Sequence, residues 1–251
     1  MGLGITEPKF AFLDGDIQAV VKVYNSVEGN LVLFNEYLCY RLAILIGLEM
    51  PNSGICLLDK ETKIMNGVAN ESNEGYGFYS TYLNKATKLV SPIISLIKNK
   101  DDFYKIILFD HIIYNTDRNE GNLLVQYYKN NISLKVIDHT HVFKNGAIWD
   151  KYCLHDGIKE KDYFSTDIMD RNSVLYGMFF EHISYNKDVC RSLIPSFRQH
   201  IRNDKISEII HEMPNKWLPE QNDQEALKLY LLYRIEHLED IIETIDRYLK
   251  R

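Results

Sequence analysis

Hydrophobic and polar positions divide the chain into a short β-rich start and a longer, mainly helical remainder. Two apolar stretches, residues 10–13 and 19–24, predict strands on either side of the turn residues Asp14-Gly15-Asp16. Residues 33–48 carry apolar side chains at helical spacing and are followed by glycine and proline, which predicts a helix. Residues 55–58 predict a further strand.

The second half of the chain reads as helices, with one pair of strands between them. The helical stretches are residues 103–114, 174–184, 189–201, 204–212 and 224–251. The last is amphipathic, and its heptad-like spacing suits either a dimer seam or packing across the back of a helical lobe. A polar stretch at residues 61–77 predicts the connection between two lobes, residues 1–72 and 73–251. The predicted fold class is α+β.

Composition narrows the range of functions without naming one. The chain has 251 residues, of which 45% are hydrophobic and 25% charged, as in ordinary globular proteins. A net charge of −6 argues against a general nucleic-acid-binding protein. Four widely spaced cysteines predict reduced thiols and a cytoplasmic setting. No signal peptide is expected, and no apolar run is long enough for a membrane span.

The chemistry concentrates in residues 110–143, where an apolar helical run opens into a polar loop that carries Asp117. Two predicted strands, residues 123–128 and 132–137, follow as a hairpin. Equal counting from Asn130 makes Asn122 and Asp138 cross-strand neighbours, with β-carbons about 5 Å apart. An amide oxygen and a carboxylate at that distance can share one magnesium ion, and Asp117 can position an attacking hydroxyl. The arrangement suits phosphoryl transfer.

Two charged residues nearer the start fit the same chemistry. Lys22 lies in the predicted strand 19–24, and Glu36 lies in the first turn of the helix that follows. A strand lysine that pairs with a helix glutamate holds nucleotide phosphates in kinases. Each residue also has a simpler interpretation: Lys22 as a solvated strand residue, and Glu36 as a carboxylate favoured at a helix start. Glycines upstream, among them Gly4 beside Thr6, can cradle phosphate or belong to a frayed terminus.

The stretch Asn-Thr-Asp-Arg-Asn-Glu-Gly-Asn-Leu-Leu, followed by Val-Ile-Asp-His, resembles the HipA-like kinase family, and related patterns occur in phosphatidylinositol kinases. The resemblance implies a protein-kinase-like bilobal fold, with a small β-rich nucleotide-binding lobe and a larger helical catalytic lobe. It departs from ordinary protein kinases, because Asn115-Thr116 replaces His-Arg and His139-Thr140 replaces Phe-Gly. The roles that it implies are Asp117 as catalytic base, Asn122 and Asp138 as metal ligands, and Lys22 with Glu36 as the ion pair.

By this resemblance the protein is an ATP- and magnesium-dependent kinase that phosphorylates a serine or threonine of a protein substrate. A small-molecule or lipid-headgroup kinase shares the catalytic geometry, and a nucleotide-binding pseudokinase acting as an interaction module is the alternative from another class. Some relatives carry an autophosphorylation site in the loop over the nucleotide, which makes Thr6 a candidate here. The resemblance also allows for a regulatory partner protein.

Several residues in this region leave alternatives open. His139 and His141 have the His-x-His spacing of metal ligands. The pairs Asp110-His111 and Asp138-His139 suggest a metal-dependent phosphohydrolase, which competes with the kinase interpretation, although that class has the order His-Asp. Structural roles for His139 and His141 are the simpler expectation. Arg118 can meet either a phosphate or a neighbouring carboxylate.

Overall fold

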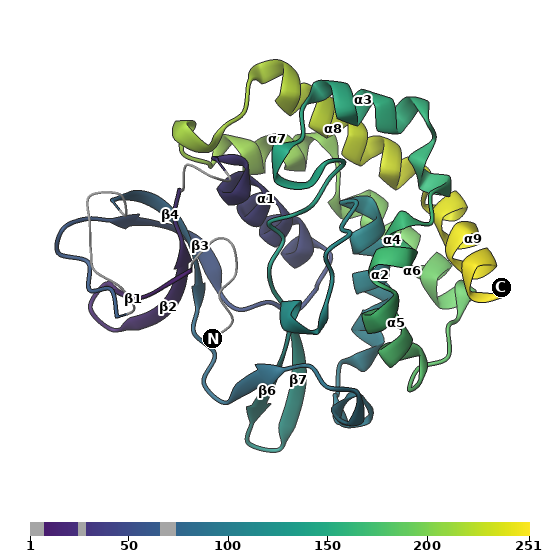
Figure 1. Cartoon of the computed structure of the whole chain (residues 1–251), viewed down its shortest axis with the longest axis horizontal. Helices are drawn as coiled ribbons and strands as arrows, with labels where there is room; N and C mark the ends of the chain where they lie inside the picture. Colours follow the sequence, from purple (N-terminus) through teal and green to yellow (C-terminus); the bar gives the residue numbers. More distant parts are fainter. Residues whose placement is uncertain (1–7, 25–28, 66–73) are drawn as a thin grey trace.

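The computed structural model describes residues 8–24, 29–65 and 74–251. A small β-rich lobe lies beside a larger helical lobe, with helix α1 (Leu31–Leu45) between the small sheet and the helices (Figure 1). The predicted α+β, protein-kinase-like division into two lobes is therefore confirmed. No helix among the described residues is long and apolar enough to cross a membrane.

The small lobe contains one antiparallel sheet with the strand order β1-β2-β4-β3. A backbone bridge between Ala11 and Ile64 extends this sheet at its β1 edge. Ala11, Ala19 and Val21 are fully buried and form a small core of their own with Leu58. The strands are β1 (Lys9–Leu13), β2 (Ile17–Lys22), β3 (Ser53–Leu58) and β4 (Gly75–Thr81).

Strand β4, the last of this sheet in the sequence, shows which residues belong to the small lobe. β4 pairs with both β2 and β3, so Gly75–Thr81 completes the small lobe. The predicted division between residues 72 and 73 would separate this strand from its sheet. We propose that the connection between the lobes follows Thr81.

Helices make up most of the large lobe, which also contains a second antiparallel sheet of order β5-β6-β7. Its strands are β5 (Ala86–Lys88), β6 (Leu123–Tyr128) and β7 (Asn131–Val136). The helices are α2 (Phe103–Ile112), α3 (Lys151–Lys159), α4 (Asp167–Arg171), α5 (Ser173–Phe180), α6 (Lys187–His200), α7 (Asn203–His211), α8 (Gln221–Glu236) and α9 (Leu238–Leu249).

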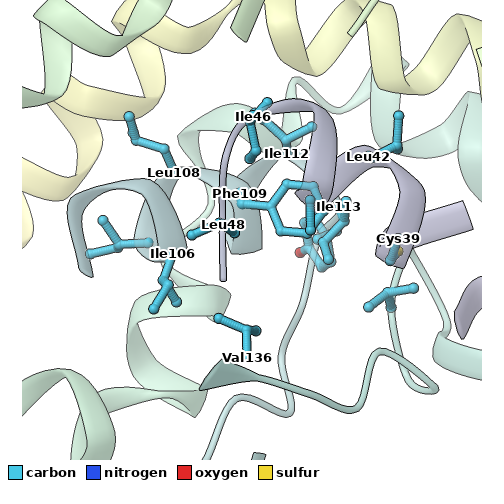
Figure 2. Packing of buried hydrophobic residues seen from close by; sticks show 14 of the residues in the cluster. Cys39, Leu42, Ile46, Leu48, Ile106, Leu108, Phe109, Ile112, Ile113 and Val136 are labelled. Atoms are coloured by element: carbon cyan, nitrogen blue, oxygen red, sulfur yellow. The ribbon is translucent and has the colours of Figure 1, made fainter. Parts of the chain in front are cut away.

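Helix α2 lies at the centre of the main core, and all but one of its residues are buried. Figure 2 shows Phe109 and Ile112 of α2 among Leu42 and Ile46, so the same apolar cluster joins α2 to α1 and hence to the small lobe. The polar loop that follows α2 is therefore held by a helix that has little freedom to move.

The predicted single helix at residues 224–251 is wrong in one respect: it is two helices, α8 and α9, which meet at His237. The backbone of His237 leaves the helical region with ψ 21°, and its ring stacks on Tyr163 with centroids 4.0 Å apart. The apolar seam of both helices is buried against the same lobe, so intrachain packing accounts for its spacing. Its members are Leu227, Leu231, Ile235, Leu238, Ile242 and Ile245.

Candidate active site

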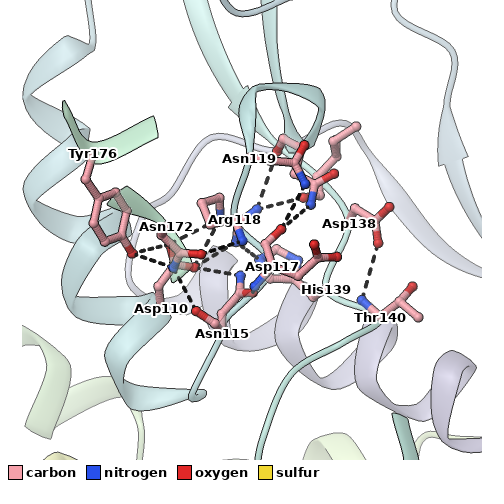
Figure 3. A network of polar contacts seen from close by, with 12 residues as sticks. Asp110, Asn115, Asp117, Arg118, Asn119, Asp138, His139, Thr140, Asn172 and Tyr176 are labelled. Carbon is pink, nitrogen blue, oxygen red and sulfur yellow. Dashed lines mark hydrogen bonds and ion pairs between the residues drawn. The ribbon is translucent and has the colours of Figure 1, made fainter. Parts of the chain in front are cut away.

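A buried ion pair fixes the base of the loop that follows α2. The Arg118 guanidinium donates from Nη2 to Asp110 Oδ1 at 2.9 Å, and both side chains are fully buried. Asn115 Nδ2 and the Tyr176 hydroxyl also donate to this carboxylate, at 2.9 and 3.0 Å (Figure 3). Of the two partners considered for Arg118, the structure selects the neighbouring carboxylate.

Arg118 also connects the loop to the segment after β7. Its Nη1 donates to the carbonyl of Ile137 at 2.9 Å, and its Nη2 contacts His139 Nε2 at 2.9 Å. Because a guanidinium can only donate, His139 Nε2 accepts and the ring is neutral. Burial and the nearby Arg118 charge both hold the pKa of His139 well below its usual value. These contacts give His139 a structural role, which is the simpler of the two expectations from the sequence.

Asp117 combines a fixed backbone with an exposed carboxylate. Its amide donates to Asn115 Oδ1 at 2.9 Å, and its carbonyl accepts from Asn122 Nδ2 at 2.7 Å. The side chain is 54% exposed, and its Oδ2 lies 3.6 Å from Nδ1 of His141. The loop therefore presents this carboxylate to an incoming molecule in a defined place.

Three elements bring the second group of charged residues together. Lys22 at the end of β2 contacts Glu36 Oε1 on α1. The same ammonium lies 2.9 Å from Asp138 Oδ1 and 2.8 Å from the hydroxyl of Thr140, both in the segment after β7. The structure thus places Lys22, Glu36 and Asp138 in one cluster, although Asp138 is far from the other two in the sequence.

The electrostatics of this cluster favour the charged forms of Lys22 and Asp138. Burial alone would lower the pKa of Lys22, but the charges of Glu36 and Asp138 outweigh it and raise the pKa. Burial would raise the pKa of Asp138, but Lys22 holds it well below its ordinary value. Burial raises the pKa of Glu36, and the ammonium of Lys22 opposes that shift.

The predicted cross-strand pairing of Asn122 with Asp138 is wrong by one position. Leu123 pairs with Val136, and the amide of Ile137 donates to the carbonyl of Asn122 at 3.1 Å. The turn has two residues, not three, so the residue opposite Asn122 is Ile137. Because side chains alternate along a strand, this slip changes the direction in which Asp138 can point. Asp138 lies beyond the ladder and adopts a left-handed backbone with φ 60°.

Comparison with known proteins identifies the family. A family model described as HipA-like kinase matches residues 2–246. The chain belongs to the HipA-like kinase family. Membership makes it a kinase, and the resemblance seen in the motif around Asp117 and Asp138 is confirmed. No functionally curated protein matches the chain.

Two solved structures show the same fold at low sequence identity. The proinflammatory kinase CtkA of Helicobacter pylori is 14% identical, with a TM-score of 0.60 over 100% of this chain and 94% of that one. HipA of Shewanella oneidensis MR-1, solved in a complex with HipB and operator DNA, is 10% identical, with a TM-score of 0.53 over 98% of this chain and 67% of that one.

Two side chains of this HipA-like kinase, Asp138 and Asn122, carry oxygen atoms of the kind that a magnesium ion takes. The contacts of the Asp138 carboxylate with the Lys22 ammonium and with the amide of Thr140 fall on Oδ1. Asn122 uses its amide nitrogen toward Asp117, which leaves its oxygen. Carboxylate and amide oxygens are hard ligands of the kind that magnesium takes.

Two further expectations from the sequence concern a metal site that would serve a phosphohydrolase and the residues Gly4 and Thr6. No group of three or more His, Cys, Asp or Glu side chains in residues 8–24, 29–65 and 74–251 could hold a metal ion. The phosphohydrolase alternative stays a prediction. Gly4 and Thr6 lie outside the described residues. Sequence reasoning did not specify Asp110 as the partner of Arg118, and it missed the role of Thr140. The only signal for Thr140 was a hydroxyl two positions after Asp138.

Proposed function

We propose that this protein is an ATP- and magnesium-dependent kinase that transfers the γ-phosphate to a serine or threonine hydroxyl of a protein substrate. The observation that carries the proposal is the convergence of Lys22, Glu36 and Asp138 from three separate elements. The small lobe takes the role of the nucleotide-binding lobe, and Gly4 and Thr6, which lie outside the described residues, are proposed to contribute to nucleotide binding.

Each residue of the site has a task in this reaction. Asp117 orients the acceptor hydroxyl and receives its proton as the oxygen attacks the γ-phosphorus. The bond from that phosphorus to the β,γ-bridging oxygen breaks, and ADP carries the bond's electrons away. Lys22, oriented by Glu36, donates to the nucleotide phosphates.

Metal binding falls to the residues at the open end of the hairpin. Asp138 and Asn122 supply the protein oxygens for magnesium. When bound, magnesium neutralises charge on the phosphate oxygens and helps to align them. The lowered pKa of Asp138 keeps its carboxylate ionised at neutral pH, which is the form that binds a cation.

The exposure of the Asp117 side chain favours a protein as the phosphate acceptor. Its carboxylate is more than half exposed, so a hydroxyl on a protein surface can reach it without entry into a closed cavity. A small-molecule kinase with the same site would need further groups that enclose its substrate. Phosphoproteomic comparison of a lysate treated with wild type or with the Asp117→Asn variant identifies the acceptor.

The test of the reaction is transfer of label from γ-labelled ATP. Asp117→Asn keeps the size of the side chain and removes the base, so turnover should fall about 10²- to 10⁴-fold. Magnesium-ATP should still bind, as measured by calorimetry. Asp156→Asn, at an exposed position on α3, is the matched control and should keep full activity. Unchanged turnover in Asp117→Asn would remove Asp117 from the role of base.

A further inference from the structure

Thr140 lies at the point where the two lobes meet in the site, and its side chain is almost fully buried. Its hydroxyl accepts a hydrogen bond from Lys22 Nζ at 2.8 Å. The same hydroxyl donates to Glu36 Oε1 at 2.8 Å. Thr140 thus contacts both members of the ion pair that joins β2 to α1.

Only a hydroxyl group can serve in this position. An ammonium has donors and no acceptor, and an ionised carboxylate has acceptors and no donor. A side chain that bridges Lys22 and Glu36 through one atom must accept from the first and donate to the second. Threonine and serine meet that condition at this size, whereas valine has the same shape and meets neither half of it.

The backbone of Thr140 joins the same residue to the metal-binding segment. Its amide donates to Asp138 Oδ1 at 3.3 Å, and its carbonyl accepts from Asn35 Nδ2 at 2.9 Å. Asn35 precedes Glu36 on α1 and also accepts from Trp149 Nε1 at 2.9 Å. One residue therefore links the carboxylate of Asp138, the ion pair and helix α1.

We propose that Thr140 is a positioning residue that holds Lys22 in place for the nucleotide phosphates. It acts through Lys22 and Glu36 and need not touch the substrate. The inference rests on the proposed function, because it assigns a role within the same nucleotide site. It also goes beyond that function, since a site with Lys22, Glu36 and Asp138 alone could operate without the hydroxyl.

Thr140→Val and Thr140→Ser are the two variants that test the proposal. Valine removes a hydrogen bond to each of two charged groups, so affinity for magnesium-ATP should fall about ten- to hundredfold. Serine keeps the hydroxyl and should keep most of the affinity. Adenosine has no phosphates, so its affinity should be the same in the wild type and both variants.

A control separates this effect from the general loss of a buried threonine hydroxyl. Thr244 on α9 is also buried, and its hydroxyl donates to the carbonyl of Asp240 at 2.9 Å, within its own helix. Thr244→Val should leave the affinities for magnesium-ATP and adenosine unchanged. Calorimetric titration of both ligands against the full-length chain and its variants gives all of these values.

The outcomes separate this inference from the proposed function. Equal magnesium-ATP affinity in wild type and Thr140→Val would overturn the role of Thr140, even if the wild type transfers phosphate. A parallel loss of magnesium-ATP and adenosine binding, or a serine variant as weak as the valine variant, would also overturn it. If the wild type transfers no phosphate, the proposed function fails, while the difference between valine and serine still decides the role of Thr140.

Discussion

Arg118→Met should be among the most damaging single substitutions on the large-lobe side of the site. The substitution keeps a long apolar stem but removes a guanidinium that donates to the Asp110 carboxylate and to the carbonyl of Ile137. Asp110 would then remain a fully buried carboxylate, with only Asn115 and Tyr176 as hydrogen-bond donors. Removal of one partner of such a pair typically costs about 3–5 kcal/mol.

Urea unfolding followed by circular dichroism measures that cost as a loss in the free energy of unfolding. Arg202→Met is the matched control, because Arg202 pairs with Asp204 at the surface, where both side chains are about half exposed. Exposed pairs contribute about 0–1 kcal/mol, so the control should lose no more than that. A loss below about 1 kcal/mol in Arg118→Met would refute the reasoning. Arg118→Lys keeps the charge without the forked donors and should fall between the two.

Three further predictions follow from single contacts. Asp138→Ala should weaken binding of magnesium-ATP far more than binding of metal-free ATP, and equal losses in a titration would contradict the metal role. Gly77→Ala should destabilise the small lobe by about 1–3 kcal/mol in urea, because its new methyl group would lie 2.9 Å from the carbonyl of Lys22. Burial lowers the pKa of His111, so the unfolded chain binds the extra proton below about pH 6.5 and stability falls by up to about 1.4 kcal/mol per pH unit. His111→Leu should make that decline shallower without removing it, because the pKa of His139 is lowered too, and His211→Leu, at an exposed position, is its control.

Those parts of the site could be predicted that depend on residues close together in the sequence. A lysine within a strand and a glutamate in the next helix are close in sequence, and their order suffices to suggest the pair. The expected place of Glu36 in the first turn is wrong, because α1 begins at Leu31 and Glu36 lies in its second turn. The pair of Asp110 and Arg118 gave no such signal, because a charge within an apolar helical run has no evident partner. Its environment includes Asn172, which donates to the carbonyl of Asn115 from 57 positions away. Tyr176 on α5 adds a hydrogen bond to Asp110 on α2, so groups from distant parts of the chain complete this cluster.

The break at His237 escaped prediction for a related reason. Apolar residues continue at helical spacing through the break, so local propensity favours one continuous helix. What distinguishes His237 is a tertiary contact, the stack of its ring on Tyr163, together with its contact to Asp240 at 2.7 Å. Tertiary contacts of this kind override local preference, and no periodicity in the sequence encodes them.

The hairpin before Asp138 shows how an error of one residue in the predicted register changes the predicted position of Asp138. Three polar residues stand between the strands, and the turn uses only Lys129 and Asn130, with Lys129 at φ 53°. The ladder therefore ends one residue earlier than equal counting suggested, and Asp138 is free of strand geometry. Its left-handed backbone is uncommon outside glycine and costs about 1 kcal/mol or more. That cost is offset where Asp138 meets Lys22, so the ion pair between β2 and the segment after β7 also holds the proposed metal ligand in a conformation that the chain would otherwise avoid.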